Sequence, residues 1–181
     1  MVAALRADGE LGMTSEGKSF RFGRHLVTDH WSARRAFPPT SMKRIEEAIA
    51  EGERTHAGQV RFVVEGALPM GQLVRGETPR ERALDVFARL RIWDTEENCG
   101  VLIYLLLADR DVEIIADRGI HRKVGDEAWQ AICHAMEAAF REKRFLDGAI
   151  HGIEAINALL GQHFPRTSSG PNELPDQPVV L

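Results

Sequence analysis

The run GVLIYLLLA, from Gly100 to Ala108, is apolar on every side. A strand with this character needs cover on both of its faces, and such strands lie in the centre of sheets that helices flank on both sides. The run is also far too short to cross a membrane as a helix. It therefore predicts a buried central strand, and this prediction constrains the fold more than any other feature of the sequence.

The residues around this run predict further strands. Asp109-Arg110-Asp111 is a tight polar turn, and the VEIIAD stretch after it pairs back as an antiparallel strand, which gives a β-hairpin. An earlier stretch, QVRFVVEG, is rich in β-branched and aromatic residues and also predicts a strand. This strand reaches the central one through a helix, which indicates a right-handed parallel crossover.

Four helices are predicted where apolar residues recur three and four positions apart. Pro39 opens the first and Thr78-Pro79 the second, while the last two cover roughly residues 126–142 and 145–163. The resulting order is α-β-α-β-β-α-α. It predicts an α/β protein, a three-layer α/β/α sandwich with a mixed, mainly parallel sheet that contains one central β-hairpin.

Weakly patterned segments lie at both ends of the chain. Residues 1–20 contain Gly and Ser with little periodicity, and residues 166–181 are rich in Pro, Ser and Gly. We therefore expect a flexible N-terminal segment and a disordered C-terminal tail around one domain, residues 21–165. Within that domain, residues 21–38 could form a strand or a short helix.

The composition excludes several classes of protein. A net charge of −4 gives no support for a nucleic-acid partner. Two cysteines do not make a disulfide framework. The first residues lack a basic region followed by a long apolar one, so we predict no secretory signal. We expect a cytoplasmic protein that does not insert into the membrane.

Acidic residues flank the hairpin at its open end. In an antiparallel pair the start of the first strand lies beside the end of the second, so the loops before and after the hairpin should meet. Several carboxylates and one amide would then converge, and hard divalent cations prefer such oxygen ligands. The predicted ligands of a calcium or magnesium ion are Asp94, Glu97, Asn98, Asp117 and Asp126.

Other interpretations of this edge stay open. Nearby basic residues could neutralise the acids and leave only a solvated edge of salt bridges, and Asp126 could simply cap a helix. The opposite edge is the usual ligand location in parallel sheets, but its loop, residues 67–77, has no phosphate-binding or nucleophile motif. The basic residues in question are Arg118, His121, Arg122 and Lys123.

The stretches RALDVFARLRIWDTEENCGVLIYLLLADRDVEIIADRGI, VGDEAW and FREKRFLDGAIHGIEAINALLGQHFP together resemble the TPM domain family over about residues 40–165. That family includes thylakoid-lumen photosystem II repair proteins and bacterial membrane-anchored or periplasmic proteins. The matched features are Trp93 at a helix end, Asn98 and Gly100 before the apolar strand, the hairpin, Asp126, and a Phe-x-x-Gly element from Phe145.

The resemblance implies an α/β/α sandwich, in agreement with the pattern of elements. Plant members of the family are assigned acid phosphatase activity, and some members bind calcium through acidic loops at one end of the sheet. This chain departs from the family in two places. Asn98-Cys99-Gly100 stands where Asn-Asn-Gly is common, and Asp117-Arg118-Gly119-Ile120 replaces an aromatic Gly-x-Gly loop. The chain is similar to a short, soluble bacterial branch.

Three functions agree with these observations. The leading one is a TPM-like binding module with a divalent-cation site at one edge of the sheet and a membrane-associated protein partner. The second is a metal-dependent acid phosphatase acting on phosphate monoesters. Phosphoryl transfer needs cations that neutralise the phosphate, for which Arg118 and Arg122 are available, but no nucleophile is identifiable, so no catalytic residue is assigned. The third is a structural interaction domain without metal.

Overall fold

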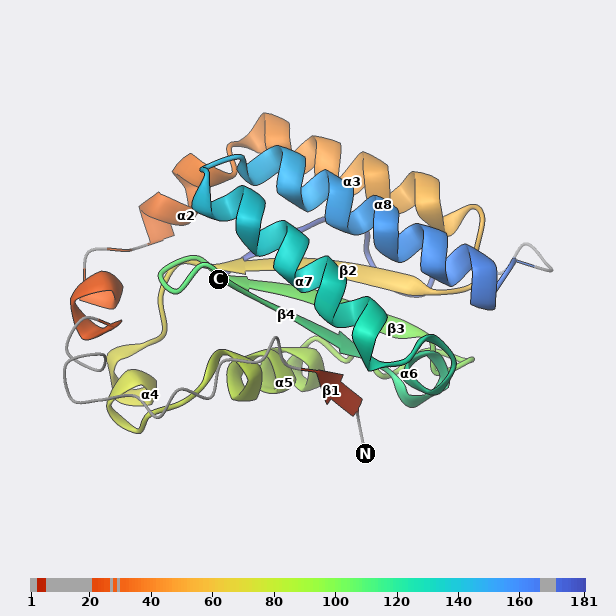
Figure 1. Ribbon diagram of the computed structural model, residues 1–181, viewed down its shortest axis with the longest axis horizontal. Helices are drawn as coiled ribbons and strands as arrows, with labels where there is room; N and C mark the ends of the chain where they lie inside the picture. Colours follow the sequence, from red (N-terminus) through yellow and green to blue (C-terminus); the bar gives the residue numbers. More distant parts are fainter. Residues whose placement is uncertain (1–2, 6–20, 27, 29, 167–171) are drawn as a thin grey trace.

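The computed structural model describes residues 3–5, 21–26, 28, 30–166 and 172–181 (Figure 1). The prediction of a flexible segment over residues 1–20 therefore falls, apart from residues 3–5, outside the described residues. Those three residues form a short strand at one edge of the sheet.

A five-stranded sheet forms the middle layer of the molecule. β2 is parallel to both β3 and β5, whereas β4 is antiparallel to both β3 and β1. Only β4 thus runs against the others, and the sheet is mixed and mainly parallel, with the β3–β4 hairpin at its centre, as the sequence predicts. Across the sheet the strands are β1 (Ala3–Leu5), β4 (Asp111–Ala116), β3 (Gly100–Leu106), β2 (Gln59–Glu65) and β5 (Val179–Val180).

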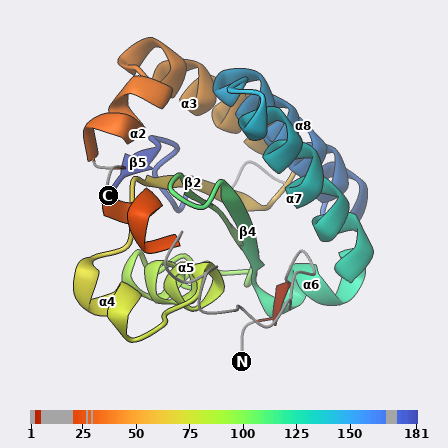
Figure 2. The same cartoon turned by 60° about the vertical axis from the view of Figure 1, so that its left-hand side comes forward.

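Helices cover both faces of the sheet, which confirms the three-layer sandwich (Figure 2). None of the helices in the part of the chain that the structure describes has the length and apolar character needed to cross a membrane. One face carries α2 (His30–Ala36), α3 (Pro39–Glu53), α6 (Arg118–Val124), α7 (Asp126–Arg141) and α8 (Phe145–His163), and the other carries α4 (Met70–Val74) and α5 (Pro79–Arg89).

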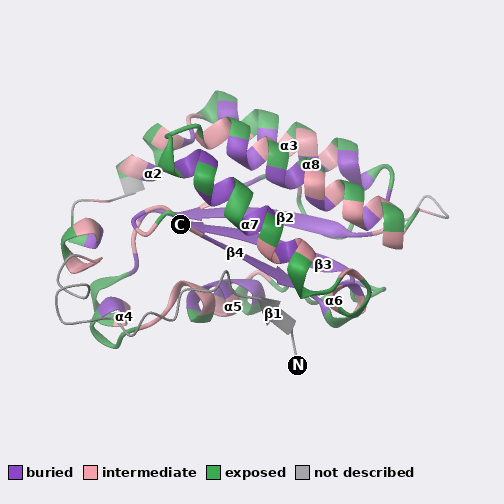
Figure 3. Cartoon of the chain, in the orientation of Figure 1, coloured by how far each residue is buried: buried purple, intermediate pink, exposed green. Residues whose placement is uncertain are grey.

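β3 is the buried strand that its apolar run predicts. All seven of its residues are buried, and its alternate side chains enter two separate cores, one on each face of the sheet (Figure 3). The one polar side-chain group of β3 is the hydroxyl of Tyr104, which donates a hydrogen bond to Glu65 Oε2 at 2.7 Å. Arg82 on α5 binds the same carboxylate through two hydrogen bonds of 2.8 and 2.9 Å. Buried polar groups are stable only when paired in this way, so the network belongs to the fold.

Short helices form where the sequence predicts loops or leaves strand and helix as alternatives, and residues 21–26 are helical as well. α2 and α6 have seven residues each and α4 has five. Such short helices give little periodic signal and are marginal in isolation, because most of the stability of a protein helix comes from packing. The long helices α3, α5, α7 and α8 begin at the residues that the sequence predicts.

The segment 172–181 packs along β2, although the sequence predicts a disordered tail there. The side-chain oxygen of Gln59 accepts hydrogen bonds from two successive backbone amides of this segment, at 2.8 and 2.9 Å. The buried guanidinium of Arg61 donates to two of its carbonyl oxygens. Leu174 enters the core, and β5 completes the sheet. Because β2 binds mainly the backbone of this segment, its side-chain composition gives no sign of the docking.

Candidate functional site

The open end of the β3–β4 hairpin brings together part of the predicted metal site. The amide of Asp117, after β4, donates to the carbonyl oxygen of Gly100 at 2.9 Å. A Cβ added to Gly119 would lie 2.9 Å from the carbonyl oxygen of Asn98 and 3.4 Å from that of Glu97. The first turn of α6 therefore lies directly against the peptide groups of the loop before β3, as the hairpin geometry predicts.

Asp117 is the best-placed ligand in this neighbourhood. Its side chain is buried, and Oδ1 accepts a hydrogen bond from the amide of Arg118 at 2.6 Å at the start of α6. Its other oxygen, Oδ2, is also buried and has no hydrogen-bond partner among the described residues. A buried carboxylate oxygen without a partner is unfavourable, and a cation or an ordered water would stabilise it.

The thiol of Cys99 lies among the acidic residues of this edge. Burial raises the pKa of Cys99 to about 11, the Thr95 hydroxyl opposes the rise, and the carboxylates of Glu173, Glu97 and Asp117 add to it. At neutral pH the sulfur therefore stays a thiol and is a poor nucleophile. The same effects show that Glu173, Glu97 and Asp117 each lie near enough to Cys99 to act on its thiol.

Glu173 is the residue of this neighbourhood that the sequence does not reveal. Its carboxylate accepts a hydrogen bond from the amide of Glu96 at 2.8 Å, which ties the C-terminal segment to the loop before β3. Glu173 lies in a segment rich in Pro, Ser and Gly. No motif or periodicity in that segment could have placed it beside the hairpin.

Two of the predicted ligands have other partners. Asp94 is exposed and pairs with Arg91 at 2.9 Å, and Asp126, also exposed, lies 3.2 Å from Nε2 of His121. Within the described ranges, no three His, Cys, Asp or Glu side chains are close enough to hold a metal ion by themselves. A cation at this edge would need the carbonyl oxygens beside Asp117, and the five-residue site stays a prediction.

The turn at the other end of the hairpin is held by ion pairs. Asp109 lies 2.8 Å from Arg21, 2.9 Å from Arg24 and 3.2 Å from Nε2 of His25. Nδ1 of His25 accepts a hydrogen bond from the amide of Leu68 at 3.0 Å, so Nε2 carries the proton that faces Asp109. Burial alone would raise the pKa of Asp109, but the bonds from His25 and Arg21 hold it below its usual range.

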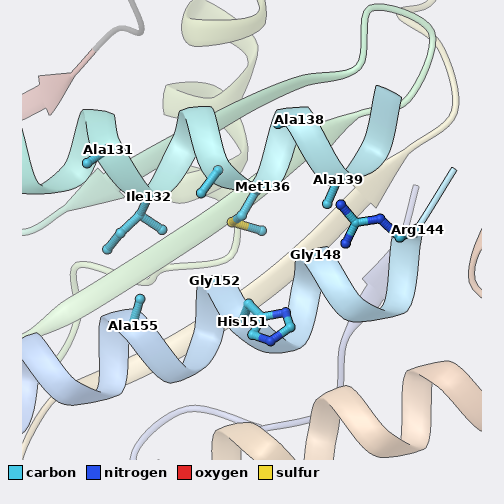
Figure 4. Close-up of a pocket in the computed structure, with 11 residues that line it drawn as sticks. Ala131, Ile132, Met136, Ala138, Ala139, Arg144, Gly148, His151, Gly152 and Ala155 are labelled. Atoms are coloured by element: carbon cyan, nitrogen blue, oxygen red, sulfur yellow. The ribbon is translucent and has the colours of Figure 1, made fainter. Parts of the chain in front are cut away.

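Several hollows among the described residues lie away from the acidic edge. One of about 440 Å³ runs between α7 and α8, where small residues bring the helices together and Arg144 and His151 stand at the rim (Figure 4). A second, of about 370 Å³, lies between α3 and α8. A third, of about 530 Å³, opens at the end of β3 beside the hairpin turn and has a basic lining.

Comparison with known proteins agrees with this architecture. The sequence model of the TPM domain matches residues 33–159, most of the chain. The chain belongs to the TPM domain family. This TPM domain is also similar in structure to the BA42 protein from the psychrophilic bacterium Bizionia argentinensis, known from NMR, with 29% sequence identity and a TM-score of 0.69. The alignment covers 78% of this chain and 93% of BA42. No curated protein matches the chain significantly.

Proposed function

We propose that this TPM domain is a binding module that holds a divalent cation, calcium or magnesium, at the open end of the β3–β4 hairpin. The observation that carries the proposal is the buried Oδ2 of Asp117, which lacks a hydrogen-bond partner in the described structure. The carbonyl oxygens of Glu97 and Asn98 lie against the same helical turn. Carboxylate and carbonyl oxygens are the ligands that calcium and magnesium take, with water at the remaining positions.

The charge available to this site sets the expected affinity. Asp117 supplies one buried carboxylate, and Glu97 and Glu173 stand nearby. Calcium sites with few charged ligands bind with dissociation constants on the order of 10⁻⁴–10⁻³ M. A cation at tenfold this concentration would stabilise the folded state by about 1.4 kcal/mol. Binding should therefore stabilise the contacts that the loop before β3 makes with the C-terminal segment and with α6.

Calorimetric titration of the metal-free protein with calcium and with magnesium tests the proposal. Asp117→Asn should abolish the binding heat, while asparagine can still cap α6. Asp94→Asn is the matched control, because it removes the same charge from an exposed predicted ligand that pairs with Arg91. If Asp94→Asn weakens binding as much, the five-residue site is the better description. Wild-type protein without heat or thermal shift at millimolar metal would refute cation binding altogether.

A metal-dependent phosphatase that acts on phosphate monoesters is the second candidate function. It is favoured by Arg118 and Arg122, which are exposed next to Asp117 and could bind a phosphate group there. The same proteins can be assayed with an aryl phosphate. Equal hydrolysis by the wild type and by an Asp117→Asn/Asp126→Asn variant would show that this edge does not catalyse the reaction.

A membrane-associated protein is the partner that the family suggests for a binding module. Its capture by the wild type, but not by Asp117→Asn, would place the partner surface at the cation site. Capture by neither protein, together with no binding heat and no phosphatase activity, would leave a structural interaction domain without metal as the remaining function.

A further inference from the structure

The hollow at the carboxyl end of β3 gathers positive charge from three distant parts of the chain. Arg35 reaches it from α2, Arg110 from the hairpin turn, and Lys143 from the turn between α7 and α8. Two hydroxyl residues, Thr28 and Ser32, complete its polar lining, and no acidic residue lines it. The lining therefore has the chemistry of a site for an anion.

The ion pairs of the described residues leave out the three cations of this hollow. All three are exposed. Of the two acids that flank Arg110, Asp109 is held by Arg21, Arg24 and His25. On a chain with a net charge of −4, this is a local concentration of positive charge. Such a field attracts anions to the hollow.

Two of the cations stand on backbone that is unfavourable for their residue type. Arg110 has a φ of 53° and Lys143 a φ of 63°, in the left-handed region where glycine or asparagine is favoured. Lys143 follows the end of α7, where glycine is the usual residue. Arg35 has a simpler local role, since it stabilises the C-terminal end of α2. Arg91, which lies outside the hollow, has the same φ of 53°, so this conformation by itself assigns no role to Arg110 or Lys143.

The beginning of α8 lies at this hollow, and its first turn carries one acidic residue, Asp147. α8 has 19 residues and begins at Phe145, which also lines the hollow. Arg144, the residue before it, makes no side-chain hydrogen bond to the free amides of the first turn. The amino end of a long helix carries partial positive charge and favours an anion. Phe145 and Leu107 together supply an apolar wall.

We propose that this hollow binds a small phosphorylated organic molecule. Its phosphate group lies among Arg35, Arg110 and Lys143, and its organic part lies against Leu107 and Phe145. The volume of about 530 Å³ is much larger than a phosphate ion needs. The site also lies beyond the carboxyl end of β3, where α/β sheets commonly bind their ligands. It stands at the opposite end of the sheet from Asp117 and is independent of cation binding there.

Titration of the full chain with phenylphosphonate, which resists hydrolysis, and with inorganic phosphate tests the proposal by calorimetry. Phenylphosphonate should bind several-fold more tightly than inorganic phosphate, because only its ring can contact the apolar wall. Its affinity should fall as salt is added, since the three cations are exposed. Arg110→Ala/Lys143→Ala should lower the affinity about tenfold or more through the loss of two charged donors.

The control variant is Lys43→Ala/Arg75→Ala, which removes the same two residue types at exposed positions on α3 and beside α4. It should bind phenylphosphonate like the wild type, and so should Asp117→Asn. Equal affinity of the two double variants would overturn the site, because binding would then follow net charge alone. Equal affinity of the wild type for both probes would overturn the assignment to an organic phosphate.

Discussion

The two ends of the central hairpin carry opposite charge, and the fold assembles that charge in different ways. At the open end, the predicted ligands stand in two short stretches of sequence, yet Asp94 and Asp126 pair locally, while the buried Oδ2 of Asp117 has no hydrogen-bond partner among the described residues. At the closed end, Arg35 and Lys143 come from distant helices to meet Arg110. Charges that are neighbours in sequence can thus be separated by folding, and scattered ones can converge.

Carboxyl groups near the two ends respond to these surroundings in opposite directions. Glu53 stands beside the start of β2, where its carboxylate accepts a hydrogen bond from Val60 at 2.7 Å. Burial raises the pKa of Glu53 to about 8, and the nearby Asp176 adds to the rise. At the other end, basic partners hold the pKa of Asp109 below its usual range. Burial at Glu53 therefore disfavours its ionised form, whereas the basic partners of Asp109 stabilise the ionised form there.

The open end should depend most strongly on close packing of the backbone. A Cβ added to Gly100 would collide with the carbonyl oxygen of Ile92, and Gly100 is also fixed by pairing with β2. We expect Gly100→Ala to lower the free energy of unfolding by about 3 kcal/mol, measured by urea denaturation. Gly71→Ala is the control, since a Cβ there meets nothing within 4 Å, and should change it by less than about 1 kcal/mol. Equal midpoints for the two variants would contradict this view of the open end.

The opposite pKa shifts of Glu53 and Asp109 should change the free energy of unfolding in different ranges of pH. Because the folded-state pKa of Glu53 is raised, its contribution is fully present below pH 4.5 and is lost as the pH rises to about 8. Glu53→Gln cannot ionise and keeps an acceptor for Val60, so at pH 8.5 it should be about 1–3 kcal/mol more stable than the wild type. At pH 4 the two proteins should differ little.

Asp109 and an exposed glutamate complete the pH comparison. The pKa of Asp109 is lowered, so its contribution is present above the usual aspartate pKa and is lost as the pH falls further. Asp109→Asn should therefore weaken the dependence of the free energy of unfolding on pH only in the acid range. Glu51→Gln, at an exposed position on the same helix as Glu53, should leave the curve almost unchanged. A wild-type curve that is flat between pH 5 and 8 would show that Glu53 is not protonated in the folded state.

The sequence predicts the layers of this fold and the hairpin because burial leaves a pattern in it. The apolar run of β3 and the spacing of apolar residues in α7 and α8 each show which residues of that strand or helix are buried. Asp117 could be placed beside Asn98 for a related reason, since hairpin pairing is local. Segment 172–181 and the basic hollow depend on contacts between distant residues, which no local pattern records.

The smallest expected effect concerns the backbone of the closed end. Lys143→Gly removes the steric penalty of the left-handed conformation and should raise the free energy of unfolding by about 0.5–1 kcal/mol. It should also weaken phenylphosphonate binding, because one of the three cations is lost. The control is Asn98→Gly, because Asn98 has a φ of 52° at the open end. Its free energy of unfolding should rise less, since asparagine tolerates this conformation better than lysine does. A variant that loses both stability and binding would mean that Lys143 supports the fold. Stability gained together with affinity lost would instead show that the lysine is kept for its charge.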